Sequence, residues 1–276
     1  MQIMFSIRFA TAFLLATGNS RIKTGHLLSD GVAWAFGTLF AYVLNGAMDV
    51  AEDRLNGSGR PVARGALTPG TALRAAWLCA GLAVLFSLDS PPVLGLLLAY
   101  LFCGFAYSAP PFRMTRHSHS TVATVLLLGG LTYAAGCAAA GGHRGAVPVV
   151  VFAVAMSLWM GLVGALVKDL SDVRGDQAAG RRTFVVVRGE RLARTVCAVN
   201  PVLVGVGFLA AARTLAPVLT LPAVVVLAGG LAVAHFSLTT RSDERRGRSR
   251  LPYQAFMVTQ YAAHLALLGI VVAGVR

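Results

Sequence analysis

The sequence has 276 residues, of which 56% are hydrophobic and 13% are charged, and its formal net charge is +13. Soluble domains contain roughly 25% charged residues, so an ordinary soluble globular protein is excluded. With a mean hydropathy of +0.70, the chain is predicted to be an integral membrane protein. The basic excess is explained by membrane topology and by attraction to the lipid bilayer, and we expect no nucleic-acid binding, because basic residues interleaved with aromatic ones and a soluble domain are not seen.

Apolar segments of transmembrane length follow one another along the chain. Backbone groups in hydrocarbon must form their hydrogen bonds internally, so these segments indicate helices, and the roughly ten-residue alternation of a membrane β-barrel is not seen. We expect an all-α polytopic membrane protein, with one domain over residues 1–276 that forms a bundle of nine transmembrane helices and a cytoplasmic cap of loops. The expected helices are residues 3–18, 27–49, 72–88, 92–107, 121–141, 146–168, 193–212, 216–238 and 253–274.

The basic residues predict the orientation of this bundle. With nine helices, eighteen of the 24 lysines and arginines fall on one side, in residues 54–74, 113–116, 168–194 and 241–250. Arg8 lies inside the first helix, and the opposite side holds the other five: Arg21, Lys23, Arg144, Arg213 and Arg276. By the positive-inside rule the first side faces the cytoplasm. We therefore expect a plasma-membrane protein in which this side, with the two acidic clusters described next, faces the cytoplasm.

A first polar cluster lies where an apolar run ends, in the stretch LNGAMDVAEDRLNGSGRPVARGALTP at residues 44–69. Asn45, Asp49 and Asp53 are spaced i, i+4, i+8, so they line one face of a helix. The type and spacing of these side chains predict a shared polar site at a helix end.

A second polar cluster follows the apolar run that ends before Lys168, in the stretch VKDLSDVRGDQAAGRRT. Asp169, Asp172 and Asp176 are spaced i, i+3, i+7 and again share a helix face. Together with Asp49, Glu52 and Asp53 of the first cluster, they make up six of the 11 acidic residues of the chain. More than half of the negative charge is therefore concentrated in two places.

These acids need compensation. One ionised side chain at the bilayer centre costs about 2.5–3.5 kcal/mol, so the clusters are expected near the interface. Lys168 and the neighbouring arginines could provide a salt-bridged rim without catalytic function. Alternatively, the carboxylates share Mg²⁺ ions, which prefer hard oxygen ligands and are often bound together with substrate phosphates. In that case arginines supply bidentate contacts to a diphosphate, and the candidates are Arg60, Arg64, Arg113, Arg116 and Arg182.

The clusters resemble the signatures of the UbiA superfamily of intramembrane prenyltransferases. NGAMDVAEDRLNGSGRPVARGALTP resembles the NDxxDxxxD motif and the N-x-x-x-RP-x-x-x-G that follows it. KDLSDVRGDQAAGRRTF resembles KDxxDxxGDxxxGxxT, and the YSAPP of residues 107–111 resembles the YSxPP between them. The three motifs occur in the family's order, and the resemblance spans the protein.

This resemblance implies a Mg²⁺-dependent transfer of a prenyl group from an allylic prenyl diphosphate. It implies that Asn45, Asp49 and Asp53 bind one Mg²⁺ and the diphosphate, and that a second ion is bound by Asp169, Asp172 and Asp176. The expected catalytic residues are Asp49, Asp53, Asp172 and Asp176. Arg60 and Lys168 match family positions that hold the diphosphate, and four further arginines are expected to assist them: Arg64, Arg113, Arg116 and Arg182.

The sequence departs from the family pattern at three positions. Gly46 stands where a second Asp is usual, Gly164 replaces the tyrosine of a YxxxK motif, and Thr115 stands where a lysine commonly follows YSxPPxRx. The first departure changes an outer contact. The second is expected to enlarge the substrate pocket or to alter its polarity.

The implied mechanism follows from charge. Metal ions and arginines stabilise the departing diphosphate, and ionisation of the allylic C–O bond leaves a carbocation. A helix bundle excludes the water that would quench this cation, and aromatic rings can stabilise it. Aromatic residues on the expected helices, Phe105, Phe152 and Trp159 among them, could line the pocket. The expected pocket residues are Tyr107, Tyr133 and Gly164.

The resemblance favours a small aromatic acceptor but leaves open a lipid-like one, such as a glycerol lipid, or a sugar phosphate. A membrane terpene cyclase would keep both acidic motifs and need no acceptor, so it is the alternative enzyme. A transporter predicts ionisable residues at the midplane of several helices, but the helix interiors here are nearly uncharged. A CDP-alcohol phosphotransferase requires a DGxxAR pattern, which is missing because Val50 follows Asp49.

Overall fold

A computed structural model of the chain describes residues 2–17, 24–141 and 146–273. Within these residues the named elements are all helical, and the one β-type contact is an isolated parallel bridge between His117 and Arg182. The predicted all-α fold class is confirmed. The chain separates into two compact units, Met1–Thr115 with Leu127–Ala146, and Arg116–Leu126 with Val147–Arg276. The expected single domain stays a prediction.

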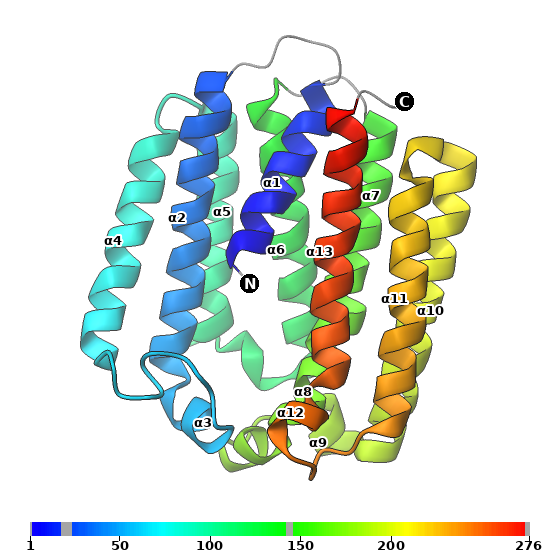
Figure 1. Cartoon of the computed structure of the whole chain (residues 1–276). Helices are drawn as coiled ribbons and strands as arrows, with labels where there is room; N and C mark the ends of the chain where they lie inside the picture. Colours follow the sequence, from blue (N-terminus) through cyan, green and yellow to red (C-terminus); the bar gives the residue numbers. More distant parts are fainter. Residues whose placement is uncertain (1, 18–23, 142–145, 274–276) are drawn as a thin grey trace. The chain divides into compact units, whose positions relative to one another are not determined.

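The first unit is built around the long helix α2 (Thr24–Met48). This helix packs against α1 (Gln2–Thr17), α4 (Pro69–Ser87) and α5 (Pro91–Ser108), as Figure 1 shows. The short helix α3 (Val50–Leu55) follows α2 directly. The second half of α6 (Ser118–Ala139) completes the unit. A 3-10 turn, η1 (Met114–Arg116), precedes α6.

Trp34 of α2 is the centre of the first unit's core. Its ring is fully buried, 6.0 Å from the ring of Phe9 on α1 and 4.9 Å from that of Tyr100 on α5. Its indole N–H donates to Thr132 Oγ1 on α6 at 3.2 Å, so this buried donor is satisfied. Gly136 lies against the backbone carbonyl of Phe9, where any Cβ would clash, so α1 and α6 approach closely.

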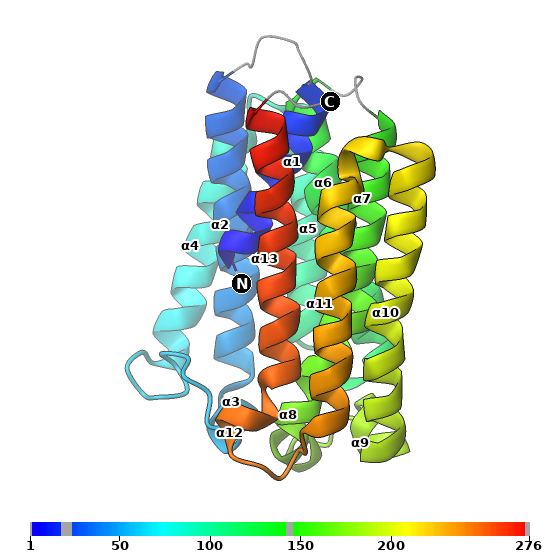
Figure 2. The same cartoon turned by 45° about the vertical axis from the view of Figure 1, so that its right-hand side comes forward.

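In the second unit, α11 (Thr220–Thr239) lies between α10 (Glu190–Leu215) and α13 (Leu251–Val272), as Figure 2 shows. Two adjacent glycines explain the close packing. A Cβ at Gly230 would lie 2.7 Å from the carbonyl oxygen of Pro201 on α10, and one at Gly229 would clash with Thr259 on α13.

The helices that follow α6 are α7 (Ala146–Leu158), α8 (Ala165–Ala178), α9 (Phe184–Arg188), α10 (Glu190–Leu215), α11 (Thr220–Thr239), α12 (Arg246–Ser249) and α13 (Leu251–Val272), with a 3-10 turn η3 (Pro217–Leu219).

Helices α7 and α8 are continuous through a π-helical segment, η2 (Trp159–Gly164), and form one candidate membrane span of 32 residues, Val147–Ala178, whose last turns are polar. Asn200 Nδ2 donates to the carbonyl of Leu162 in this segment at 2.9 Å. The expected end of this helix at residue 168 is wrong, because α8 continues to Ala178. The continuation is polar, so hydropathy does not detect it, and i, i+4 pairing of Lys168 with Asp172 supports it.

Eight helices within the described residues are long and apolar enough to cross a membrane, and α1 contributes a shorter apolar helix, Ile3–Thr17. Each of the nine expected segments coincides with one of these helices, so the expected number is approximately correct. The ends expected at residues 18 and 274 lie outside the described residues. The short helices α3, α9 and α12 were not expected, because four to six residues give no readable periodicity.

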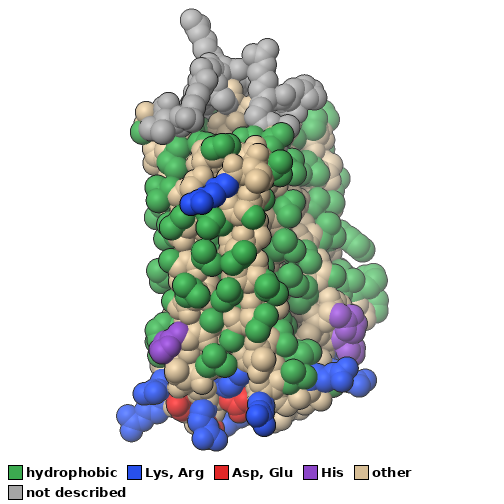
Figure 3. All heavy atoms as spheres, turned by 90° about the vertical axis from the view of Figure 1, so that its right-hand side faces the viewer, with side chains coloured by type: hydrophobic (Ala, Val, Ile, Leu, Met, Phe, Trp, Pro, Cys, Tyr) green, Lys and Arg blue, Asp and Glu red, His purple; other side chains and the backbone are tan. Residues whose placement is uncertain are grey.

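The surface over α10 and α11 is typical of a protein in contact with lipid. Figure 3 shows that hydrophobic side chains cover most of this face and that basic and acidic side chains gather at one end. The exposed apolar residues include Leu203, Val206, Leu231 and Leu238. Arg213 is exposed near the end of α10, whereas the other four residues expected on its side lie outside the described residues: Arg21, Lys23, Arg144 and Arg276. The orientation in the membrane stays a prediction.

Candidate functional site

The first acidic motif continues from α2 into α3 through a slight break at Asp49. The backbone N–H of Asp49 donates to Asn45 at 3.0 Å, and that of Asp53 donates to Asp49 at 2.8 Å. These are helical i, i+4 hydrogen bonds, so the break does not change the register of the three residues. The face predicted from their spacing is therefore present.

The side chains of this motif are held by an amide and an arginine. Asn45 Nδ2 donates to Asp49 Oδ2 at 2.8 Å, and Arg60 Nη1 donates to Asp53 Oδ2 at 2.9 Å. The Arg60 guanidinium also lies over the ring of Tyr42, 5.1 Å from its centroid. Burial by itself lowers the pKa of Arg60, but the charge of Asp53 and the neighbouring Tyr42 raise it above its ordinary value. Arg60 is thus a permanent cation beside the motif.

A tight loop returns Arg60 to the end of α3. Gly57 has a φ of 60°, a conformation that favours glycine, and the N–H of Ser58 donates to the carbonyl of Asp53 at 2.8 Å. The stem of Arg60 lies near Gly46, where an added Cβ would be 3.8 Å from Arg60 Cδ, an ordinary van der Waals distance. Arg64 follows one turn later, where its N–H donates to the carbonyl of Arg60 at 3.0 Å, and its side chain is exposed.

The second acidic motif lies on the last turns of α8. The side chains of Asp169, Asp172 and Asp176 are all buried, and two of them form ion pairs with basic residues. Lys168 Nζ lies 3.0 Å from Asp172 Oδ2, and Arg181 Nη1 lies 3.7 Å from Asp176 Oδ1. Two acids of the motif are therefore paired with basic residues, and both possibilities, a salt-bridged rim and a Mg²⁺ site, stay predictions.

Two basic residues beside the second motif, Arg181 and Arg246, were missed by sequence reasoning. Arg181 is buried against Asp176, whereas the expected residue, Arg182, is exposed. Gly180, with a φ of 67°, turns the chain so that the N–H of Arg181 donates to the carbonyl of Asp176 at 2.8 Å. The second, Arg246 of α12, has its Nη2 3.9 Å from Asp172 Oδ1. The glycine after α8 could have indicated the turn, but nothing in the local sequence indicates Arg246.

The backbone joins two expected arginines of the second unit. The N–H of Arg182 donates to the carbonyl of Arg116 at 2.6 Å, and the N–H of Phe184 donates to Ser118 Oγ at the start of α6. Both arginine side chains are exposed. The backbones of Arg116 and Arg182 are therefore adjacent, and their anion-binding role stays a prediction.

The remaining expected residues of the first unit lie on three different segments. Arg113 has a φ of 41°, uncommon for a residue with a side chain, and follows the cis peptide bond between Pro110 and Pro111. Tyr107 of α5 is half-buried. Tyr133 of α6 is fully buried, and the Arg8 guanidinium lies 5.9 Å from its ring centroid. Tyr133 thus already interacts with one cation of the chain.

Gly164 is in close contact with an aromatic ring. A Cβ at this position would clash with Phe256 of α13, whose ring stacks on Trp159 at 5.9 Å. The expectation that Gly164 enlarges a pocket is wrong on this side of the helix, because the Phe256 ring fills the space. The departure from tyrosine allows η2 and α13 to pack closely.

Gly164→Ala is expected to destabilise the protein by about 1–3 kcal/mol, because the added methyl group overpacks the contact with Phe256. Gly207→Ala is the matched control, since Gly207 lies in helix α10 and a Cβ added there would meet no atom within 4 Å. Thermal unfolding of both variants in detergent measures the effect. A Gly164→Ala protein as stable as the control would show that the Phe256 contact is not tight.

The donor chemistry of both motifs fits Mg²⁺. Their ligands would be carboxylate and amide oxygens, which are the hard donors that Mg²⁺ prefers. Within the described residues no three His, Cys, Asp or Glu side chains converge as a ready-made metal site. The acids instead pair with basic side chains that a divalent cation could replace. In each unit, the residues that would hold the ion lie on a helix end rather than on a flexible loop.

Comparison with known proteins extends these observations. The model of the UbiA prenyltransferase family matches residues 6–272. A digeranylgeranylglyceryl phosphate synthase of Natronomonas pharaonis is 33% identical over 60% of this chain and 58% of its own. A probable homogentisate phytyltransferase 2 of Oryza sativa is 32% identical over 58% of this chain and 44% of its own. The matches thus span about half the length of these curated relatives.

Solved structures share the fold. A UbiA homolog from Archaeoglobus fulgidus bound to GPP and Mg²⁺ superposes with a TM-score of 0.66 at 16% identity, over 98% of this chain and 97% of that one. The apo structure of a UbiA homolog from Aeropyrum pernix K1 has the same TM-score at 19% identity, over 95% and 96%. The similarity covers nearly the whole of each chain and shows that the helical architecture is the same.

Proposed function

The chain belongs to the UbiA prenyltransferase family, and from this we propose that it transfers a prenyl group from an allylic prenyl diphosphate to a small acceptor in a Mg²⁺-dependent reaction. The observation that carries the proposal is the pairing of each acidic motif with its own basic residues. Arg60 contacts Asp53, and Lys168 contacts Asp172. The basic side chain of such a pair would bind a phosphate oxygen in place of the carboxylate if a metal ion bound the carboxylate.

In the proposed reaction the acids bind metal and the bases bind diphosphate. The six expected metal-binding residues are Asn45, Asp49, Asp53, Asp169, Asp172 and Asp176. When bound, Mg²⁺ supplies Lewis-acid stabilisation of the negative charge that develops on the departing diphosphate. Arg60 and Lys168, which now contact carboxylates of the two motifs, would bind oxygens of the diphosphate. Their charges add to the stabilisation of the leaving group.

The buried apolar and aromatic side chains would protect the allylic cation from water. An allylic cation left by the diphosphate reacts with water, so the residues around it must exclude solvent. We propose that Tyr107, Tyr133 and the aromatic side chains around Gly164 serve this purpose. Tyr133 is fully buried, and so are Trp159 and Phe256, which close the space beside Gly164. Aromatic faces also stabilise nearby positive charge.

For the acceptor we propose a small aromatic molecule. The names of two relatives support this class: the homogentisate phytyltransferase of Oryza sativa and a 2-acylphloroglucinol 4-prenyltransferase of Humulus lupulus, 30% identical over 60% of this chain and 40% of its own. The name of the Natronomonas pharaonis relative instead supports a lipid-like acceptor.

We further propose that the protein resides in the plasma membrane with both acidic motifs facing the cytoplasm, on the basis of the basic residues near them.

Incubation without an acceptor separates a transferase from a terpene cyclase. Membranes containing the protein are supplied with Mg²⁺ and geranyl, farnesyl or geranylgeranyl diphosphate, and the organic extract is analysed by mass spectrometry. We expect the diphosphate to stay intact until an aromatic acceptor is added. A cyclic hydrocarbon or alcohol formed without acceptor, and absent from an Asp49→Ala control, would establish the cyclase instead.

A further inference from the structure

The loop between α11 and α13 brings an arginine to the second acidic motif. Arg246 begins α12, a helix that contacts both α8 and α13. Its Nη2 lies 3.9 Å from Asp172 Oδ1, while Lys168 takes the other oxygen of the same carboxylate at 3.0 Å. At 3.9 Å the contact with Arg246 is electrostatic rather than a hydrogen bond. About a third of the Arg246 side chain, 33%, is exposed, so it borders both the motif and solvent.

Three further arginines of this loop, Arg241, Arg248 and Arg250, have other side-chain contacts, although the charge of Arg250 also acts on Asp172. Arg241 pairs with Asp243 at 3.5 Å, and Arg248 pairs with Glu244 at 3.0 Å, each with a largely exposed side chain. Arg250 lies over the ring of Tyr253, 5.2 Å from its centroid. Of the ion pairs formed by the described residues 241–250, the one made with an acid of the motif is that of Arg246.

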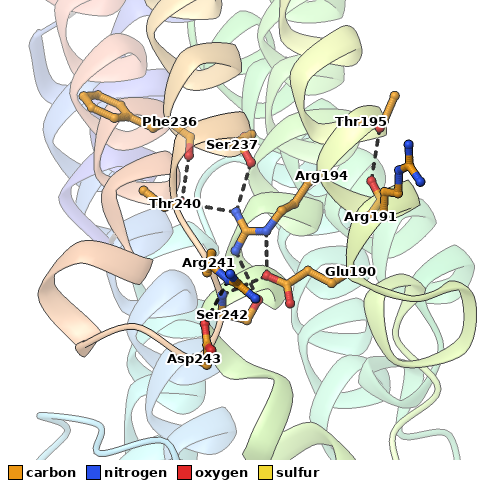
Figure 4. Close-up of polar contacts among 10 residues, drawn as sticks. All are labelled: Glu190, Arg191, Arg194, Thr195, Phe236, Ser237, Thr240, Arg241, Ser242 and Asp243. Atoms are coloured by element: carbon orange, nitrogen blue, oxygen red, sulfur yellow. Dashed lines mark hydrogen bonds and ion pairs between the residues drawn. The ribbon is translucent and has the colours of Figure 1, made fainter.

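A buried arginine anchors the start of this loop. Figure 4 shows Arg194 of α10 reaching between α11 and the loop, with Glu190 beside it. Arg194 Nε donates to Glu190 Oε1 at 2.7 Å, and Nη1 donates to the carbonyl of Ser237 at 3.0 Å and to Thr240 Oγ1 at 3.2 Å. Nη2 donates to Ser242 Oγ at 3.2 Å, and the N–H of Ser242 donates to Glu190 Oε1 at 2.8 Å. We refer to these five residues as the Arg194 clamp.

The Arg194 clamp fixes the backbone on one side of Arg246. A buried guanidinium whose nitrogens are all bonded is costly to displace, because any opening leaves charge or polar groups unpaired. On the other side, α13 begins at Leu251, and the N–H of Arg250 donates to the carbonyl of Arg246 at 3.2 Å. Arg246 therefore lies between two anchored points, and its approach to Asp172 is determined by the backbone as well as by its own ion pair.

We propose that Arg246 is a further diphosphate-binding residue and that the Arg194 clamp is the device that positions it. The proposal rests on the proposed function, because it assigns a role toward the leaving group of that reaction. Lys168 is the closer cationic partner of Asp172, so Arg246 can bind a different anion while that carboxylate stays paired. The planar guanidinium of Arg246 offers a fork of N–H donors that matches two phosphate oxygens.

Binding of an unreactive donor tests the role of Arg246. Purified protein in detergent is titrated with geranyl S-thiolodiphosphate and Mg²⁺ in a calorimeter. Arg246→Gln is expected to weaken binding by about tenfold or more, as for the loss of a charge-assisted hydrogen bond. Arg248→Gln removes the same charge from the same helix and is expected to change binding by less than about twofold, because exposed pairs contribute little.

The Arg194 clamp is tested through its coupling to Arg246. Glu190→Gln and Ser242→Ala each loosen the clamp, and each is expected to weaken binding of the thiolodiphosphate in the wild-type background. Neither is expected to weaken it further when combined with Arg246→Gln, because both act through that residue. Additive losses in the double variants would show a general structural effect and overturn the positioning role.

The outcomes separate this inference from the proposed function. If wild-type protein binds the thiolodiphosphate and Arg246→Gln binds it as well as Arg248→Gln does, the inference is wrong and the prenyltransferase proposal stands. If wild-type protein with Mg²⁺ binds none of the geranyl, farnesyl and geranylgeranyl thiolodiphosphates, both are wrong.

Discussion

Alanine in place of Asp49 or Asp172 is expected to reduce the rate of prenyl transfer by on the order of a thousandfold, while the protein still inserts into the membrane. Each variant removes one proposed metal ligand, and each also frees a partner: Asn45 loses its acceptor, or Lys168 loses its ion pair. The released groups are polar and near a helix end, so the fold tolerates the change better than the chemistry does. Initial rates with a saturating donor and acceptor measure the effect.

Glu52→Ala is the matched control for the first motif. Glu52 lies on α3 between Asp49 and Asp53 and carries the same charge, but it is not at a position of the family motif. We expect it to retain most of the activity. If Glu52→Ala and Asp49→Ala lose activity equally, negative charge at this helix end, rather than metal ligation by named residues, is what the reaction needs.

Removal of divalent metal is expected to stop turnover completely. Treatment with EDTA should leave no detectable product, and added Mg²⁺ should restore the full rate. Ca²⁺ should restore it poorly, because it is larger and takes more ligands at longer distances. A conservative variant, Asp176→Asn, should require a higher Mg²⁺ concentration for half-maximal rate, since a neutral amide binds the ion less strongly. Wild-type activity in metal-free buffer would falsify the metal assignment.

The arrangement of the two motifs was predictable from the sequence to different degrees. The i, i+4, i+8 spacing of Asn45, Asp49 and Asp53 fixes their register in any helix, and the structure keeps that register through the break at Asp49. The end of α8 was not predictable from hydropathy, because residues 169–178 are polar and lie beyond the apolar run. The helix persists there through its own hydrogen bonds and the pairing of Lys168 with Asp172.

The basic residues around the motifs show where sequence reasoning ends. Arg60 was identified from its place in the RP element, and the structure brings it to Asp53 by a glycine turn. The choice between Arg181 and Arg182 depends on the direction of one turn, which adjacent identical residues cannot reveal. Arg246 reaches Asp172 only because α12 packs on α8, and that contact is a property of the tertiary fold.

Gly164 illustrates a different limit. The replacement of a tyrosine by glycine suggests empty space, because the side chain is lost. The space is filled by Phe256, which comes from α13, far away in the sequence. A single sequence shows which side chain is missing at a position but not which neighbour takes its volume.

The most direct test of the proposed function measures two products together. Membranes containing the protein are incubated with Mg²⁺, geranylgeranyl diphosphate and homogentisate, and inorganic diphosphate and prenylated acceptor are quantified over time, with shorter donors in parallel. The proposal predicts that diphosphate is released one for one with prenylated acceptor and that neither forms without the acceptor. Failure to release diphosphate from every donor, with every aromatic and glycerol-lipid acceptor tried, would contradict it.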